Sequence, residues 1–482
     1  MLSTLMIIPV LASLVVALAP KNSRQITIFA ISGAFIWSLY LLWQFDSSNS
    51  QMQFSEYMAW LPHLGLTYSL GVDGLSLPLV VLNGLVTLIA LFTIEDNIER
   101  ARLHYCLILL INAGITGALV AQNLLLFILF YELELIPFYL MISIWGSQKR
   151  GYAAIKFLLY TAVSGLLVLA AFLGMNQGSF DYSNLAVDSF SLKAQLILLT
   201  LVIVGFAIKV PLVPLHTWLP DAYTEASPAT TILLGGILAK LGTYGLIRFG
   251  LELFPTAWAL VAPGLSIIGT LSVLYGALGA IAQKDIKRMV AYSSIGHMGY
   301  ILVAAAAANR LSILGSVAQM ISHGLILALL FYLVAIVERK TGTRDLDVLN
   351  GLMNPIRGLP LISGLLILGG MASAGIPGLV GFVAEFIVFQ GSFSSFPVAT
   401  LLCIIASGLT AVYFVILLNR TCFGKLDNEL AYYPKVTLRE SLPPVILTII
   451  IIILGLQPNL LLAPMQATTD SLSLINTQIA NL

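Results

Sequence analysis

Long apolar stretches alternate with short polar connections along almost the whole chain. A helix needs about 20 mostly apolar residues to cross the hydrocarbon core of a bilayer, and by this measure we expect about 14 transmembrane helices in an all-α polytopic membrane fold. The predicted spans are residues 2–20, 26–45, 75–94, 104–121, 123–145, 153–175, 194–218, 227–250, 256–282, 289–308, 311–337, 359–391, 397–419 and 440–463.

Two of these spans are interrupted. The seventh contains Pro211 and Pro214 directly after Lys209, and the twelfth contains the run Gly375–Gly378 before Glu385. Proline removes a backbone donor and disrupts a helix, and irregular backbone at membrane depth is tolerated only inside protein or beside a water-filled cavity. Two matched breaks five spans apart predict two related five-helix units. The second unit would be inverted relative to the first, as in many transporters.

This pattern divides one integral membrane domain, residues 1–482, into four parts. The connections between spans are too short for a soluble domain, including 46–74, which carries Tyr57 and Trp60, and the stretches 338–358 and 420–439. The predicted parts are the first three spans in 1–100, a first inverted repeat in 104–250, a second in 256–423, and a last span with its tail in 440–482.

Composition supports a membrane protein. Hydrophobic residues make up 59% of the chain and charged residues 9%, whereas soluble domains carry about 25% charged residues. The net charge of +1 gives no reason to expect a nucleic-acid partner, and the three cysteines lack the spacing of a metal site or disulfide pair. The apolar N-terminus indicates a retained first span rather than a signal peptide.

The distribution of cations predicts the orientation. Lysine and arginine gather in the loops after the odd-numbered spans, and the opposite loops hold only Lys193, Arg248 and Arg310. The positive-inside rule therefore places both termini on the non-cytoplasmic side. Three further cations lie inside predicted spans, namely Lys156, Lys209 and Lys240.

Ionisable residues within a membrane mark ion pathways. Lys209 lies too far from either helix end to snorkel easily, whereas Lys156 lies near a span end and could do so. Lys240 lies in the middle of its span without a neighbouring charge in sequence, so it needs water or a partner from another helix. Glu132 and Glu134 are two residues apart, so on a helix they face different directions and at most one serves a given partner. We expect that residue to be Glu132.

The two histidines His297 and His323 lie on successive spans, and histidine can pass protons near neutral pH. Each could instead be a satisfied core residue, or the two could bind haem, but together with Lys240 and Glu385 they favour a proton relay. His216 and Asp221 flank the broken seventh span, where an entrance and a structural cap are both open interpretations. The sequence has no nucleotide, flavin or nucleophile motif, so it offers a path for ions without an energy source.

Several stretches resemble one family, the antiporter-like chain 4 subunits of the proton-pumping NAD(P)H–quinone oxidoreductase, or complex I. Gly71-Val-Asp-Gly-Leu-Ser is most similar to the cyanobacterial and chloroplast form. The other stretches are Tyr131-Glu-Leu-Glu-Leu-Ile-Pro, Lys209-Val-Pro-Leu-Val-Pro-Leu-His-Thr-Trp-Leu-Pro-Asp-Ala, Leu238-Ala-Lys-Leu-Gly, Ala291-Tyr-Ser-Ser-Ile-Gly-His-Met-Gly and Gly381-Phe-Val-Ala-Glu-Phe. In Thr224-Glu-Ala-Ser-Pro a serine stands where many relatives have proline, which affects only the expected loop shape.

This resemblance implies a proton-translocating subunit, most similar to the cyanobacterial kind, in a cyanobacterial thylakoid membrane. A chloroplast thylakoid or a bacterial inner membrane is the alternative location, and the chain could be the copy used for CO2 uptake. It implies no cofactor in this chain, and partner subunits that include sister antiporter-like chains and an arm carrying quinone and iron–sulfur clusters. It also implies that Glu132 pairs with Lys209, that Lys240, His297 and His323 form the relay, and that Glu385 is the terminal site. The alternatives are an Mrp-type sodium/proton antiporter subunit and a membrane scaffold with vestigial charges.

Overall fold

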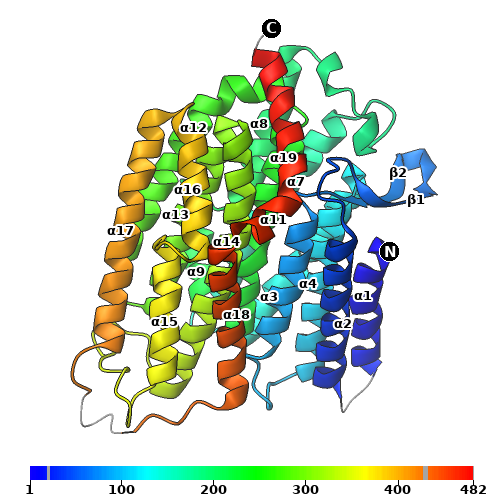
Figure 1. Ribbon diagram of the computed structural model, residues 1–482. Helices are drawn as coiled ribbons and strands as arrows, with labels where there is room; N and C mark the ends of the chain where they lie inside the picture. The colour runs from blue at the N-terminus through cyan, green and yellow to red at the C-terminus, as the bar shows by residue number, and fades with distance from the viewer. Residues whose placement is uncertain (19–21, 427–431, 481–482) are drawn as a thin grey trace.

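The computed structural model describes residues 1–18, 22–426 and 432–480, which form a bundle of helices with one small hairpin (Figure 1). The connection predicted at 420–439 includes residues 427–431, and the predicted tail ends at 482; these lie outside the described part. The α-helices are α1 (Leu2–Leu18), α2 (Ser23–Gln44), α3 (Leu77–Leu91), α4 (Ala101–Val120), α5 (Leu124–Leu133), α6 (Leu135–Trp145), α7 (Arg150–Gly174), α8 (Leu192–Lys209), α9 (Trp218–Glu225), α10 (Pro228–Leu233), α11 (Ala239–Gly245), α12 (Pro255–Ile281), α13 (Ile286–Ala307), α14 (Arg310–Thr341), α15 (Pro360–Ser373), α16 (Val380–Phe393), α17 (Pro397–Cys422), α18 (Leu438–Leu456) and α19 (Pro458–Ala480). The remaining elements are strands β1 (Gln53–Leu61) and β2 (Leu66–Val72), the 3-10 helices η1 (Pro62–Leu64), η2 (Tyr182–Asn184) and η3 (Val187–Ser189), and the π-helices η4 (Leu234–Leu238) and η5 (Leu246–Leu251).

The all-α polytopic fold is confirmed. Within the described residues, 11 helical segments are long and apolar enough to cross a membrane. Four shorter apolar helices, α1, α3, α15 and α16, also fall within predicted spans. The total of about 14 spans stays a prediction, because it depends on how these shorter helices are counted.

Both expected interruptions are present. The seventh span divides into α8, which ends at Lys209, and α9, which begins at Trp218. The twelfth divides into α15 and α16, and its break contains Gly375 at φ +67° and Gly378 at φ +92°. Glycine adopts positive φ without the steric cost that other residues carry. The breaks are confirmed, and the inverted repeat that we inferred from them stays a prediction.

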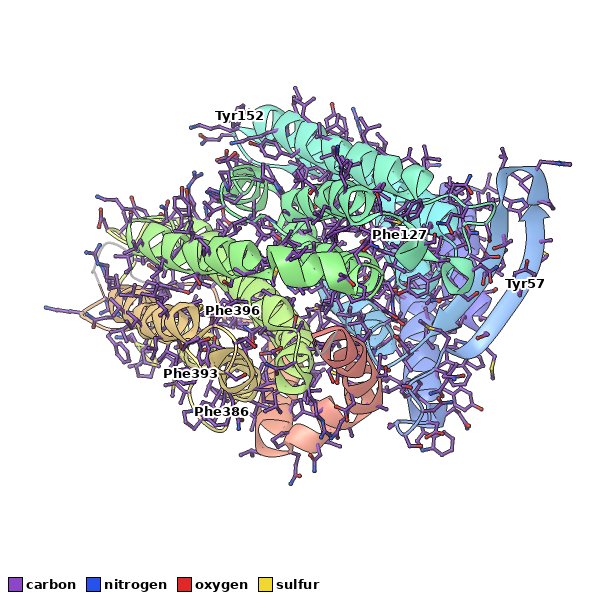
Figure 2. All side chains as sticks on the ribbon, turned by 90° about the horizontal axis from the view of Figure 1, so that it is seen from above. Tyr57, Phe127, Tyr152, Phe386, Phe393 and Phe396 are labelled. Carbon is purple, nitrogen blue, oxygen red and sulfur yellow. The ribbon has the colours of Figure 1, made fainter. Side chains whose placement is uncertain are left out.

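The connection 46–74 forms an antiparallel hairpin that we did not predict. Strand β1 pairs with β2 so that Tyr57 faces Ser69, and Gly65 turns the chain between the strands at φ +67°. Tyr57 lies at the far edge of the molecule when it is seen from above (Figure 2). We call the end of the bundle that carries β1 and β2 the hairpin end. We call the opposite end, which carries Lys156, Arg288 and Lys340, the basic end. There Lys340 pairs with Glu440 at 3.0 Å.

The interior of the bundle is built around two buried helical segments. Every residue in the most apolar stretch of α14, and in that of the continuous run Pro228–Leu251, is buried. Aromatic rings pack beside them: Phe127 lies 4.6 Å from Phe249 between ring centres and is placed well inside the packed side chains in Figure 2. Tyr152 and Phe386 lie at the periphery and are more than half exposed, as expected for residues that face lipid.

The run Pro228–Leu251 is not a regular α-helix. Two π-helical stretches, η4 and η5, lie on either side of α11. A Cβ added at Gly235 would lie 2.9 Å from the ring of Phe331 on α14, and one added at Gly236 would lie 2.6 Å from Val86 on α3. The wide turn η4 therefore sits closer to its neighbours than a larger residue would allow. Such π-bulges are frequent at functional sites.

Candidate functional site: a row of buried ionisable side chains

Lys209 is the last residue of α8 and is 3% exposed. Its Nζ lies 2.5 Å from Oε1 of Glu134 and 3.3 Å from the centre of the Tyr131 ring. An opposite charge and an aromatic face both stabilise a desolvated ammonium. Helix α8 ends at this charged residue, and its side chain reaches Tyr131 on α5 and Glu134 at the junction of α5 and α6.

The expected direct pair between Glu132 and Lys209 is wrong in this structure, because Glu134 occupies that place. Helix α5 ends at Leu133 and α6 begins at Leu135, so Glu134 is the junction residue and turns towards Lys209. The carboxylate of Glu132 instead fills the space beside Gly165 on α7. Glu132 is half-buried and still lies close enough for its charge to interact with Lys209.

Lys240 lies on α11, between the two π-helical stretches, and is fully buried. Its ammonium donates to the carbonyl oxygen of Gly235, and among the described residues it has no carboxylate within ion-pair distance. A Cβ added at Gly242 would lie 3.1 Å from the backbone nitrogen of Val210, so α11 packs directly against the end of α8. The two lysines are therefore on touching segments.

His323 and His297 continue the row into the second half of the chain. Close helix packing brings α14 to η4, because a Cβ at Gly324 would lie 2.6 Å from the carbonyl oxygen of Gly236. Lys240 and His297 both lie within electrostatic range of His323. The two imidazole rings lie 5.1 Å apart between centres. Neither ring nitrogen of His323 has a hydrogen-bond partner within the described part of the chain.

Glu385 ends the row. Its Oε1 lies 3.4 Å from Nδ1 of His297, and its Oε2 accepts a hydrogen bond from Ser407 at 3.0 Å. The other ring nitrogen of His297, Nε2, lies 3.0 Å from the hydroxyl of Ser373, the last residue of α15. A Cβ at Gly375 would lie 2.8 Å from Oε2 of Glu385. The second helix break therefore supplies both a hydroxyl and the space that this carboxylate uses.

The charges near the basic end form a separate group. Asp221 pairs with Lys156 at 2.8 Å and with Arg288 at 3.1 Å, so it joins α9 to α7 and α13. Lys156 thus has a specific partner in addition to any contact with the membrane surface. The ring of His216 packs against Tyr275 at 4.5 Å. These contacts favour the structural interpretation of Asp221 and His216 over an entrance.

The sequence indicated six of the residues in this row or beside it, and the structure adds their partners. Glu132, Lys209, Lys240, His297, His323 and Glu385 were expected. Glu134 was considered but Glu132 was preferred to it. Tyr131, Ser373 and Ser407 were missed, although Tyr131 stands in the same motif as the two acids. No group of three His, Cys, Asp or Glu that could hold a metal ion occurs among the residues that the structure describes.

Comparison with known proteins identifies the family. A family model described as "NADH:quinone oxidoreductase/Mrp antiporter, TM" matches residues 121–410. NAD(P)H-quinone oxidoreductase chain 4 1 of Synechococcus elongatus is 39% identical over 98% of this chain and 91% of its own length. The protein of the same name from Nostoc sp. is 38% identical over 97% and 90%.

Solved structures agree. A chain of respiratory complex I from Thermus thermophilus superposes with a TM-score of 0.90 at 25% identity, with 99% of this chain and all of that chain covered. A chain of the Mrp complex from Dietzia sp. also gives 0.90, over 99% and 98%, but at 21% identity it shows the fold alone. The resemblance seen in the motifs is thus confirmed, and the chain belongs to the family of antiporter-like chain 4 subunits of complex I-type NAD(P)H–quinone oxidoreductases.

Proposed function

We propose that this chain translocates protons for an NAD(P)H–quinone oxidoreductase, through the row that runs from Lys209 to Glu385. The observation that carries the proposal is the row itself. Five side chains from α8, α11, α14, α13 and α16 that can each hold a proton lie one after another in the interior, and each is at most 4% exposed. Burying five such groups is costly, and an orderly row of them across two units suits proton transfer.

The first step is the opening of the Glu134–Lys209 pair. When the carboxylate withdraws, Lys209 loses the charge that offsets its desolvation and releases its proton more readily. Breaking a buried pair costs about 3–5 kcal/mol. Moving one charge against about 180 mV costs roughly 4 kcal/mol, at about 2.3 kcal/mol per 100 mV. The pair therefore stores energy of the size that the transfer needs.

The proton then moves from Lys209 to Lys240, and by water and the imidazoles of His323 and His297 to Glu385. Glu132, whose carboxylate lies beside Gly165 on α7, is a second negative charge near Lys209. We place the hairpin end on the lumenal side of a cyanobacterial thylakoid membrane, on the basis of the loop charges and of the curated relatives. Electron transfer takes place in partner subunits that carry quinone and iron–sulfur clusters, and sister antiporter-like chains lie beside this one in the membrane.

The test is to purify the assembly that contains this chain, identify its subunits by mass spectrometry, and reconstitute it in vesicles. We expect quinone-reducing and iron–sulfur subunits to co-purify, and proton uptake driven by quinone reduction without sodium. A carbonic-anhydrase-like partner would specify the CO2-uptake form. Proton movement that requires sodium, in an assembly of antiporter subunits alone, would contradict the proposal and support the Mrp-type alternative.

A further inference from the structure

A second buried ion cluster lies on the helix that carries Lys240. Arg248 is in η5, eight residues after Lys240 in the continuous run Pro228–Leu251, which is about 12 Å along a helix axis. The sequence suggested a loop position for Arg248, and that is wrong, because the helix continues through it and the residue is 2% exposed. Its guanidinium pairs with Asp73, and with Glu252 at 2.8 Å.

Asp73 is held in place by the start of α3. Its Oδ1 accepts hydrogen bonds from the backbone nitrogens of Leu75 at 3.1 Å and Ser76 at 3.0 Å, and its other oxygen faces Arg248. This explains the motif Gly71-Val-Asp-Gly-Leu-Ser, to which the proton row gives no role. Two tyrosine rings, Tyr182 and Tyr244, also face the guanidinium at 5.8 and 5.6 Å.

A cavity of about 450 Å³ leads from the surface of the hairpin end to this cluster. Its lining includes the exposed Gln51 and Tyr57 at the hairpin and the buried Asp73 and Arg248. Arg248 is the only cation among the described residues that line it. Water from the hairpin end can therefore approach the Lys240 helix up to the ion cluster of Arg248, Asp73 and Glu252.

We propose that Arg248, positioned by Asp73 and Glu252, is a group that cannot relay protons and so closes the hairpin end of the Lys240 site to them. The guanidinium does not release its proton in proteins, so Arg248 cannot receive a proton from one side and pass it on to the other. A proton on Lys240 must then leave sideways towards His323, and protons from the hairpin end cannot return by the shorter route. This inference rests on the proposed function, because a barrier matters only if Lys240 carries transported protons.

The positioning role of the two acids follows from the cost of burial. A buried guanidinium without a partner is strongly destabilising, so Asp73 and Glu252 keep the barrier charged inside the protein. The test must therefore remove the positive charge without leaving Asp73 unpaired. The double variant Asp73→Asn/Arg248→Gln does this with little change in volume and no change in net charge. Glu252 loses its cation in this variant, but its side chain is 18% exposed and lines the cavity, so it keeps contact with water.

The experiment uses the purified complete assembly in liposomes, with an internal pH dye and a potassium diffusion potential, and without electron donor. For the double variant we expect inward proton leak to rise at least tenfold over wild type, equivalent to about 1.4 kcal/mol of barrier. The single variant Asp73→Asn keeps Arg248 and is the matched control. Its inward proton leak should equal that of wild type in the same assay.

A double variant that assembles and leaks protons no faster than wild type would overturn the inference. Should the double variant not assemble, Arg248→Lys decides, because a buried lysine can release its proton where arginine cannot. The Arg248→Lys assembly should leak protons faster than wild type. A leak equal to that of wild type would also overturn the inference. Failure of the proposed function shows up differently, as the absence of redox-driven proton uptake by the wild-type assembly.

Discussion

Lys209 and Lys240 are both buried lysines on touching segments, but their surroundings differ. Lys209 has a carboxylate at 2.5 Å and an aromatic face at 3.3 Å, whereas Lys240 donates to a single backbone carbonyl. A desolvated ammonium costs several kcal/mol unless an opposite charge compensates it. The first site therefore supplies a counter-charge for its lysine, and among the described residues the second supplies none.

Replacing each lysine by methionine should give the largest effects and separate the two sites. We expect both Lys209→Met and Lys240→Met to lower proton uptake per electron at least tenfold, equivalent to about 1.4 kcal/mol or more in the transfer step. Their stabilities should differ. Lys209→Met leaves Glu134 buried without its partner and should cost about 3–5 kcal/mol, whereas Lys240→Met breaks no ion pair.

Dye-quenching in vesicles measures the pumping, and thermal unfolding of the detergent-solubilised assembly measures the stability. Adding Glu134→Leu to Lys209→Met should restore the melting temperature and leave pumping absent. Equal destabilisation by the two methionine variants would contradict the distinction between a paired and an unpaired lysine.

The next largest effect concerns which carboxylate serves Lys209. Glu134→Gln removes the direct partner and should lower pumping about tenfold, while Glu132→Gln, whose side chain lies beside Gly165, should lower it less than about threefold. The two variants have the same chemistry two residues apart, so each controls for the other. The reverse order of severity would show that Glu132 is the functional partner despite its position.

Glu385 tests the end of the row, where a carboxylate lies 3.4 Å from His297. Glu385→Ala removes a group that can hold a proton and should reduce pumping about fivefold, whereas Glu385→Lys supplies another such group and should reduce it about twofold. Comparing initial rates of proton uptake at matched quinone reduction gives the measurement. If the lysine variant were as inactive as the alanine variant, Glu385 would act through its negative charge rather than by carrying a proton.

The smallest effect is expected at the partly exposed ion pairs of the basic end. Lys156→Met removes one of the two cations on Asp221 and should change stability by less than about 1 kcal/mol, because partly solvated pairs are weak. Pumping should stay within about twofold of wild type. Asp221→Asn leaves Lys156 and Arg288 facing each other and should be more severe. A large pumping defect in Lys156→Met would instead indicate that this residue belongs to the proton path.

Much of the helical arrangement could be predicted from the sequence, because prolines and glycines indicate where a membrane helix is interrupted. The breaks after Lys209 and around Gly375 follow from this chemistry. The choice between Glu132 and Glu134 could not be read. Pro137 accounts for the interruption between α5 and α6, because proline removes the helical hydrogen bond to the carbonyl of Leu133, four residues earlier. Helical spacing says that the two face different ways, and only packing decides which one faces Lys209.

The buried position of Arg248, the π-helical turns and the hairpin could not be predicted either. The buried position of Arg248 depends on Asp73, which lies 175 residues away in the chain, and long-range charge pairing leaves no local pattern. The π-helical turns around Lys240 replace the usual helical spacing without altering composition. The hairpin was missed because the stretch 46–74 is polar enough to suggest a loop, although Gly65 lies between two strand-forming runs.

The wide turn η4 gives Lys240 an unusual acceptor, the carbonyl of Gly235 five residues earlier in the same helix. The carbonyl oxygen of Gly235 therefore belongs to the wide turn of the backbone and also accepts the hydrogen bond from Lys240. An ammonium polarises a carbonyl more strongly than a neutral amine does. A single carbon-13 label at Gly235 would thus turn that peptide group into a vibrational reporter, whose infrared frequency records whether the neighbouring lysine holds its proton during turnover.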